Sequence, residues 1–301
     1  MDELRYISRL DPEFPEKLKN ISDPPAGIYV KGRLPDENVK SVAIVGAREC
    51  SQYGKNITAY FASHLSAAGV QIISGLARGV DGIAQLNAVR AGGSTFGILG
   101  CGIDVVYPRS NEYIYKEAVK NGGLISEYEP SAAPLKPYFV QRNRLISAFC
   151  DILLVIEARE KSGTAITVRN ALMQGKDIYA VPGRLTDPLS AGCNKLIAQG
   201  AGIALNPETI LMALDRSLNE PVIATAKKKI FDDSGIKRER VKLEGDEKKV
   251  YGLLDLYPKS LDEIVSASGL TVSGALEALL NLRIKGIVCE CAKNNYVRKM
   301  L

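Results

Sequence analysis

The chain has 301 residues, of which 46% are hydrophobic, and a formal net charge of +5 at pH 7. This length and hydrophobic content suffice for a large core and a second, smaller domain. A membrane-spanning protein is excluded, because no apolar run reaches the roughly 20 residues of a transmembrane helix. A zinc site is disfavoured, because the six cysteines lack CxxC spacing and the single histidine has no partner ligand nearby. We therefore expect a cytoplasmic protein with no membrane contact and no metal or other cofactor.

Short apolar runs alternate with segments of helical periodicity over the first two thirds of the chain. The runs are rich in Val and Ile and lack polar alternation, which is typical of strands covered on both faces. The segments between them, such as 54–69 and 81–93, repeat apolar residues at helical spacing and end at glycine. This pattern predicts an α/β fold with a doubly wound, mainly parallel Rossmann-like sheet. The predicted strands are 41–46, 70–75, 94–100, 123–128, 151–158 and 177–183.

The last part of the chain has the pattern of a winged-helix-like domain. Ser260 and Glu263 are spaced as a capping box at the start of one helix, and a second helical segment and a short strand follow. A recognition helix presents its N-terminal residues to DNA bases, whereas this second helix carries Arg283 and Lys285 at its far end. We expect this domain to contact protein or to bind DNA weakly. The predicted segments are a lead-in at 1–40, a Rossmann-like domain at 41–217, a charged linker at 218–245 and the winged-helix-like domain at 246–301.

The candidate ligand site lies where the predicted strands end, because open α/β sheets bind ligands outside the carboxyl ends of their strands. Gly46, Gly75, Gly163 and Thr164 follow such ends, and Arg48 follows the first. Glycine lets backbone amides approach a ligand, and the N-terminus of a following helix adds a partial positive charge. A single glycine at such a turn more often serves packing. Several glycines together with Arg48 and Arg78, each of which can bind a phosphate with two hydrogen bonds, predict an anionic ligand.

Several catalytic classes lack their motifs in this sequence. There is no GxxxxGK[ST] loop and no GxGxxG after a strand, which disfavours ATP hydrolysis and NAD binding. A Ser/His/Asp triad has no usable histidine, and no GxSxG turn is present. Four acidic residues near the strand ends could in principle act as acids or bases. We favour a role as helix cap or arginine partner for each of them, so we assign no catalytic residue. These residues are Asp81, Asp104, Glu127 and Glu157.

The segment KPYFVQRNRLISAFC at 136–150 combines cations with aromatic rings just before a predicted strand. Cations that follow phosphates and rings that stack on bases are the two requirements of sequence-tolerant single-strand binding. The same pattern also fits a helix start whose aromatic residues pack inward and whose arginines pair with acids of the fold. Residue chemistry alone does not separate these two readings.

Six motifs in this sequence resemble, in order and spacing, those of the DNA processing protein A (DprA/Smf) family. They are VAIVGAR, SGLARGVDGIAQ, GILGCGIDVVYPRSN, YFVQRNRLIS, SGTAITVRNALMQGKDIYAVPG and AGCNKLIAQGA. The resemblance covers roughly residues 10 to 215, and we expect no counterpart of the helical N-terminal domain that many members have. It implies a homodimeric protein that binds single-stranded DNA, protects incoming DNA in natural transformation and loads the recombinase RecA.

The resemblance also implies roles for particular residues. Arg48 is expected to contact a phosphate, Lys136 the DNA backbone, and the Phe139 ring a base. Further candidates for the same surface are Arg142, Arg144, Lys161 and Lys195, and the residues expected to supply loop geometry and amides are Gly46, Gly75, Gly163 and Thr164.

Two alternatives come from other functional classes. A nucleotide phosphoribohydrolase of the lysine-decarboxylase-like type shares the fold and carries PGGxGTxxE, but Thr167 stands where its glutamate would be. Threonine cannot replace that carboxylate. A transcription factor with a ligand-sensing Rossmann domain would require sequence-specific duplex binding through the C-terminal domain. We therefore expect a DNA-binding protein that is not an enzyme.

Overall fold

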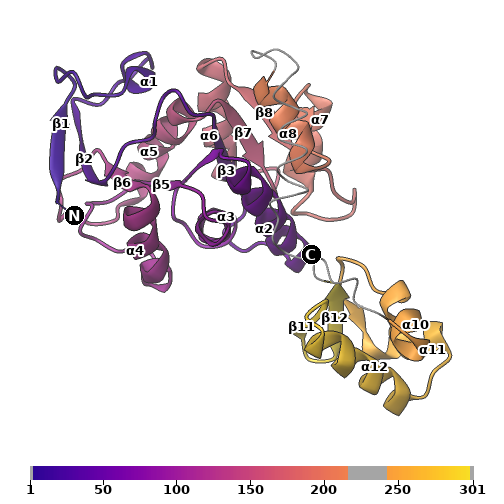
Figure 1. Ribbon diagram of the computed structural model, residues 1–301. Coiled ribbons are helices and arrows are strands. Elements are labelled where there is room, and N and C mark those ends of the chain that lie inside the picture. The colour runs from indigo at the N-terminus through magenta and orange to yellow at the C-terminus, as the bar shows by residue number, and fades with distance from the viewer. Residues whose placement is uncertain (1–2, 216–242, 299–301) are drawn as a thin grey trace.

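The computed structural model describes residues 3–215 and 243–298, which form two folded units (Figure 1). The larger unit contains a sheet of nine strands in the order β1-β2-β6-β5-β4-β3-β7-β8-β9. The strands from β6 to β9 in this order are parallel, and β1 and β2 pair antiparallel at one edge. Their bounds are β1 Arg5–Ser8, β2 Gly27–Gly32, β3 Ser41–Val45, β4 Gln71–Ser74, β5 Thr95–Leu99, β6 Gly123–Ser126, β7 Ile152–Val155, β8 Asp177–Ala180 and β9 Gly202–Ile203.

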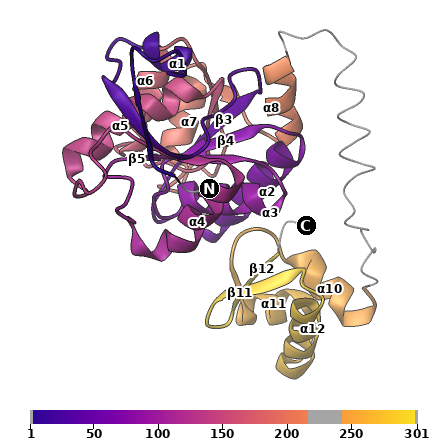
Figure 2. The same ribbon diagram turned by 60° about the vertical axis from the view of Figure 1, so that its left-hand side comes forward.

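Helices cover both faces of this sheet, as Figure 2 shows. Along β3 the side chains alternate between two cores, with Val42 and Ile44 in one and Ala43 and Val45 in the other. The Val42 face is covered by α2 (Gln52–Ala67), α3 (Val80–Arg90), α4 (Glu112–Asn121) and α8 (Pro207–Leu214). The Ala43 face is covered by α1 (Glu16–Lys19), α5 (Lys136–Phe149), α6 (Thr164–Met173) and α7 (Ala191–Ala198). A short 3₁₀ turn, η1 (Arg109–Asn111), precedes α4.

The predicted fold class is confirmed, and each of the six predicted strands is present as one of β3 to β8. The segment at 1–40 is more than the expected lead-in, because β1 and β2 extend the sheet and α1 covers part of it. Phe14 and Leu18 are buried in the core beneath α5. Most of the expected linker, residues 218–245, lies outside the described residues.

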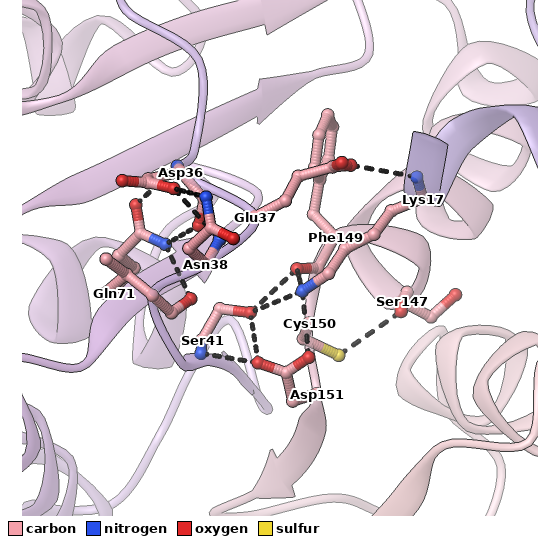
Figure 3. Close-up of polar contacts among 11 residues, drawn as sticks. Lys17, Asp36, Glu37, Asn38, Ser41, Gln71, Ser147, Phe149, Cys150 and Asp151 are labelled. Carbon is pink, nitrogen blue, oxygen red and sulfur yellow. Dashed lines mark hydrogen bonds and ion pairs between the residues drawn. The ribbon is translucent and has the colours of Figure 1, made fainter. Parts of the chain in front are cut away.

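A polar cluster ties α1 to the amino ends of β3 and β7 (Figure 3). Lys17 Nζ lies 2.8 Å from Asp151 Oδ1, and the Ser41 amide donates to Asp151 Oδ2 at 2.8 Å. Burial raises the pKa of Asp151, but the hydrogen bond and positive charge of Lys17 outweigh burial and hold the pKa below its usual value. The cluster therefore fixes the amino ends of these strands, opposite the carboxyl ends where ligands bind in such sheets.

The smaller unit has the expected winged-helix-like architecture. Its three-stranded sheet, in the order β10-β12-β11, is antiparallel. Val250, Ile264, Leu279 and Leu282 form part of its core, and the predicted capping box of Ser260 with Glu263 begins α11. The bounds are α10 Gly245–Leu253, β10 Lys259–Ser260, α11 Leu261–Ser268, α12 Val272–Ile284, β11 Val288–Ala292 and β12 Asn295–Arg298.

Within the described residues, no single helix has the length and apolar content to cross a membrane; α11 and α12, bent by 110° at their junction, meet that test only as a pair.

Candidate nucleic-acid interface

The carboxyl ends of the parallel strands form one rim of the larger sheet, and the strand order reverses at β3 and β7. From β3 the chain builds outward through β4, β5 and β6, and it then returns to place β7 on the other side of β3. Ligands of open α/β sheets bind at such a switch point. Arg48 follows β3 and Lys161 follows β7, and both side chains are exposed. Neighbouring strands lie about 4.8 Å apart, so the two loops are adjacent.

Phe139 is the centre of a cation–aromatic cluster on this rim. It lies in the first turns of α5 and is half-buried, whereas Lys136 at the start of the same helix is exposed. The guanidinium carbon of Arg48 lies 5.9 Å from the centroid of the Phe139 ring, and the Tyr107 ring lies 5.5 Å from it. A Cβ at position 100 would lie 2.5 Å from Phe139 Cδ1, so Gly100 is what allows the ring to lie here. The cluster thus places the Phe139 ring beside the Arg48 guanidinium.

Arg142 does not reach the surface, which corrects the expectation that it contacts DNA. The residue is 4% exposed, and Nη1 donates to the carbonyl of Gly75 at 2.9 Å and to that of Ile98. Burial lowers the pKa of Arg142, and the nearby carboxylate of Asp81 opposes this shift. The Gly75 amide donates to Asp81 at 3.1 Å, so Gly75 has no free amide for a ligand. Both residues instead hold the ends of β4 and β5 together beneath Phe139.

Arg144 is also turned into the protein, and the same correction applies. Its exposed fraction is 8%, its Nε donates to Asp23 at 3.0 Å, and one Nη donates to both oxygens of Glu127 at 2.7 and 2.9 Å. The reading of 136–150 as a helix with arginines paired inside the fold therefore holds for the RNR pair. The exposed Lys136 and the half-exposed Phe139 at the helix start remain available to a ligand.

The N-terminus of α2 carries an internal carboxylate where a phosphate was expected to bind. Glu157 is 1% exposed and accepts hydrogen bonds from the amide and hydroxyl of Ser51, the N-cap of α2. Burial raises the pKa of Glu157. Gly46 serves packing, because a Cβ there would lie 2.8 Å from a methyl group of Val80. Gly46 and Gly75 thus shape the loops more than they supply amides to a ligand.

Three of the four acidic residues near the rim have the roles that the sequence favoured, as a helix cap or an arginine partner. Glu157 caps a helix, Glu127 pairs with Arg144, and buried Asp81 faces Arg142. Asp104 forms an ion pair with Lys31. No group of three or more His, Cys, Asp and Glu residues within 3–215 and 243–298 is arranged to hold a metal ion.

The N-terminus of α6 remains open. Gly163 is its N-cap, no side chain caps the helix, and the backbone of Gly163 is exposed. Thr164 begins the helix, and exposed Lys161 precedes it. Lys195, which was expected on the same surface, is half-exposed and forms an ion pair with Glu160 at 2.6 Å. The open helix end with Lys161 extends the cationic surface from β3 to β7.

Two rim residues were not singled out from the sequence. Tyr107, a residue that is 45% exposed, contacts Phe139, and Arg184 is an exposed residue that follows β8. Their signal was present, because both lie in the family motifs GILGCGIDVVYPRSN and SGTAITVRNALMQGKDIYAVPG or just after them. The sequence does not show that Tyr107 lies beside Phe139 or that Arg184 lies at the end of the next strand, β8.

The sequence profile of the DNA recombination-mediator protein A family matches residues 5–215, and that of the DprA winged helix domain matches residues 237–292. The chain belongs to the DprA/Smf family. The Bacillus subtilis DNA processing protein DprA is 37% identical over 203 residues, which are 67% of this chain and 68% of that protein. Protein Smf of Escherichia coli is 38% identical over 216 residues, 71% of this chain and 58% of its own.

Solved structures of DprA proteins share the fold. DNA processing protein A of Streptococcus pneumoniae matches with a TM-score of 0.67 and 36% identity, over 70% of this chain and 74% of its own. The Helicobacter pylori protein, whose structure is described as revealing a single-stranded DNA binding mode, matches with a TM-score of 0.63 and 32% identity, over 72% and 99%. The suspected family is thus confirmed. Relatives named as DNA processing proteins do not favour the phosphoribohydrolase alternative, whose glutamate position holds the buried Thr167.

Proposed function

We propose that this chain binds single-stranded DNA along the carboxyl rim of its large sheet and does not alter the DNA chemically. The observation that carries the proposal is the half-buried ring of Phe139, 5.9 Å from the guanidinium of Arg48 and one helical turn after exposed Lys136. The single-strand binding mode described for the Helicobacter pylori relative supports it.

The proposed contacts divide into two kinds. Arg48 and Lys136 bind phosphates. Their contribution to affinity does not depend on the base sequence and decreases as the salt concentration rises. Phe139 stacks on a base, with Tyr107 beside it, and such stacking contributes about 1–3 kcal/mol per base. Lys161 and the open N-terminus of α6 continue the phosphate path past β7. Arg142, Arg144 and Gly75 support this surface from within.

We further propose that the protein acts in the cytoplasm in natural transformation, where it protects incoming DNA and passes it to RecA. Family membership supports this role. Self-association as a homodimer is supported by apolar residues at the open edge of the sheet. Ile203 on the edge strand β9 is 45% exposed, Leu205 70% and Met212 on α8 45%.

The test is equilibrium binding by fluorescence anisotropy. A labelled oligonucleotide, single-stranded or duplex, is titrated with the full chain at two salt concentrations. We expect a preference for the single strand that weakens with salt. Equal binding of both forms, or none, contradicts the proposal. Loading is then measured as the protein-dependent assembly of RecA on a strand precoated with a single-strand binding protein.

The absence of catalysis is tested separately. Nucleoside monophosphates incubated with the protein are expected to release no free base, as measured by chromatography. Release of base that depends on intact rim residues would revive the phosphoribohydrolase reading.

A further inference from the structure

The two folded units touch through an aromatic ring. Tyr257, in the segment between α10 and β10, stacks on Tyr53 of α2 with ring centroids 5.3 Å apart and an interplanar angle of 8°. The guanidinium carbon of Arg184 lies 3.5 Å from the centroid of the same Tyr257 ring. The side chain of Asn56 also donates to the Arg298 carbonyl at 3.2 Å. One ring of the small unit is thus held between two groups of the large unit.

Both groups that hold Tyr257 belong to the carboxyl rim. Arg184 follows β8, which lies two strands from β3 in the sheet order, or about 10 Å across the sheet. Tyr53 lies in the first turn of α2, five residues after Arg48, and its hydroxyl donates to the Pro182 carbonyl at 3.2 Å. This hydrogen bond lies wholly within the large unit. Tyr53 is therefore placed on the rim by a contact that does not require the small unit.

The chemistry of this position matches that of a nucleobase site. Single-strand binding proteins hold bases by stacking them on aromatic rings and beneath arginine guanidinium groups. A planar ring parallel to Tyr53 and under Arg184 makes both kinds of contact. The Tyr257 ring has the flat shape and π-face of a base, and its contacts here are those that a base would make.

We propose that Tyr53 and Arg184 form a second base-stacking position on the DNA path, which Tyr257 of the winged-helix-like unit covers when no strand is bound. The inference rests on the proposed function, since it extends the path from Phe139 and Arg48 past Lys161 to β8. A strand that reaches β8 must displace Tyr257. A shorter strand engages Phe139 and Arg48 without meeting it.

A covered position lowers the apparent affinity to the intrinsic affinity multiplied by the fraction of molecules in which the position is open. Removing the Tyr257 ring should therefore strengthen binding of long strands and leave binding of short strands unchanged. This length dependence separates a covered base site from a contact that only orients the two units.

The experiment uses the full-length protein with Tyr257→Ala and, as a matched control, Tyr113→Ala, which removes the ring of a residue that is 62% exposed on α4. Binding of labelled oligothymidylates of about 6 and about 15 nucleotides is measured by anisotropy, lengths within the range of single-strand site sizes. We expect Tyr257→Ala to bind the longer strand about fivefold or more tightly than the wild type, the low end of one stacked base. Adding Arg184→Ala should abolish the gain. The control should match the wild type on both strands.

Unchanged affinity of Tyr257→Ala for the longer strand, or an equal gain on both strands, would overturn the inference. A second readout places 2-aminopurine within the longer strand: its emission should be quenched more in Tyr257→Ala than in Tyr257→Ala/Tyr53→Leu. Equal quenching in both variants counts against stacking on Tyr53. The proposed function fails separately, through absent binding of the short strand or its insensitivity to Arg48→Ala.

Discussion

Replacing Arg48 by alanine removes a cation from the centre of the proposed DNA path. Arg48 is exposed and lies over the Phe139 ring, and none of the described side chains accepts an ion pair from it within 4.0 Å. Losing one phosphate contact should reduce the slope of log K against log salt by about 0.7 for a single strand. A hydrogen bond to a charged group contributes about 1.5–3 kcal/mol, so affinity at low salt should fall about ten- to hundredfold.

The assay is anisotropy of a labelled single strand at four or more salt concentrations. The matched control is Arg90→Ala, which removes the same charge from the exposed C-terminal end of α3, far from the rim. Circular dichroism checks that both variants are folded. An unchanged slope in folded Arg48→Ala, or an equal change in Arg90→Ala, would refute the phosphate contact.

Three further predictions follow from the same geometry. Phe139→Ala should weaken single-strand binding by about 1–3 kcal/mol with little change in salt slope, whereas Val140→Ala, its exposed neighbour on α5, should not; equal effects in an anisotropy titration would argue against stacking. Arg142→Ala should lower the free energy of unfolding by about 3–5 kcal/mol in urea denaturation, because it leaves the buried Asp81 carboxyl group without its arginine partner. A loss below about 0.5 kcal/mol would show that the buried contacts are unimportant. Asp151→Asn should lower the free energy of unfolding by about 1–3 kcal/mol at pH 7. Because the folded-state pKa of Asp151 is lowered, this difference from the wild type should vanish as pH falls through that pKa. A difference that persists at low pH would contradict the ion pair with Lys17.

The strands could be predicted because burial on both faces leaves a clear mark in sequence. The apolar runs of β3 and β7 allow little besides a central parallel strand, and Gly46 follows the end of β3 as expected. β1 and β2 were missed as parts of the sheet. β1 has four residues and exposes Tyr6 on one side. β2 has six residues, but it pairs antiparallel with β1 and β6, and nothing in its own sequence identifies those partners.

The sequence locates the site, but it does not distinguish the residues that face a ligand from those buried beneath them. Phe139 and Arg142 are three residues apart on α5 and so share a helical face, which makes both look equally available. What buries Arg142 is a set of groups from distant segments, the Gly75 and Ile98 carbonyls and Asp81. No local pattern encodes those contacts.

The occupied N-terminus of α2 illustrates the same limit. A glycine-rich strand end followed by a helix predicts an anion site, but the group that accepts hydrogen bonds at this helix N-terminus is the Glu157 side chain, 106 residues away in the sequence. The stacking of Tyr257 on Tyr53 likewise joins two domains that sequence reasoning treated separately. Motif order gave the family, whereas long-range packing decides which motif residues face a ligand.

Photo-crosslinking tests the central claim most directly. A single strand containing 5-iodouracil is irradiated with the full-length protein, and the crosslinked residues are identified by mass spectrometry. The account predicts crosslinks to Phe139 and its neighbour Tyr107 on the carboxyl rim. Crosslinks confined to the winged-helix-like unit, with none at the rim, would contradict it.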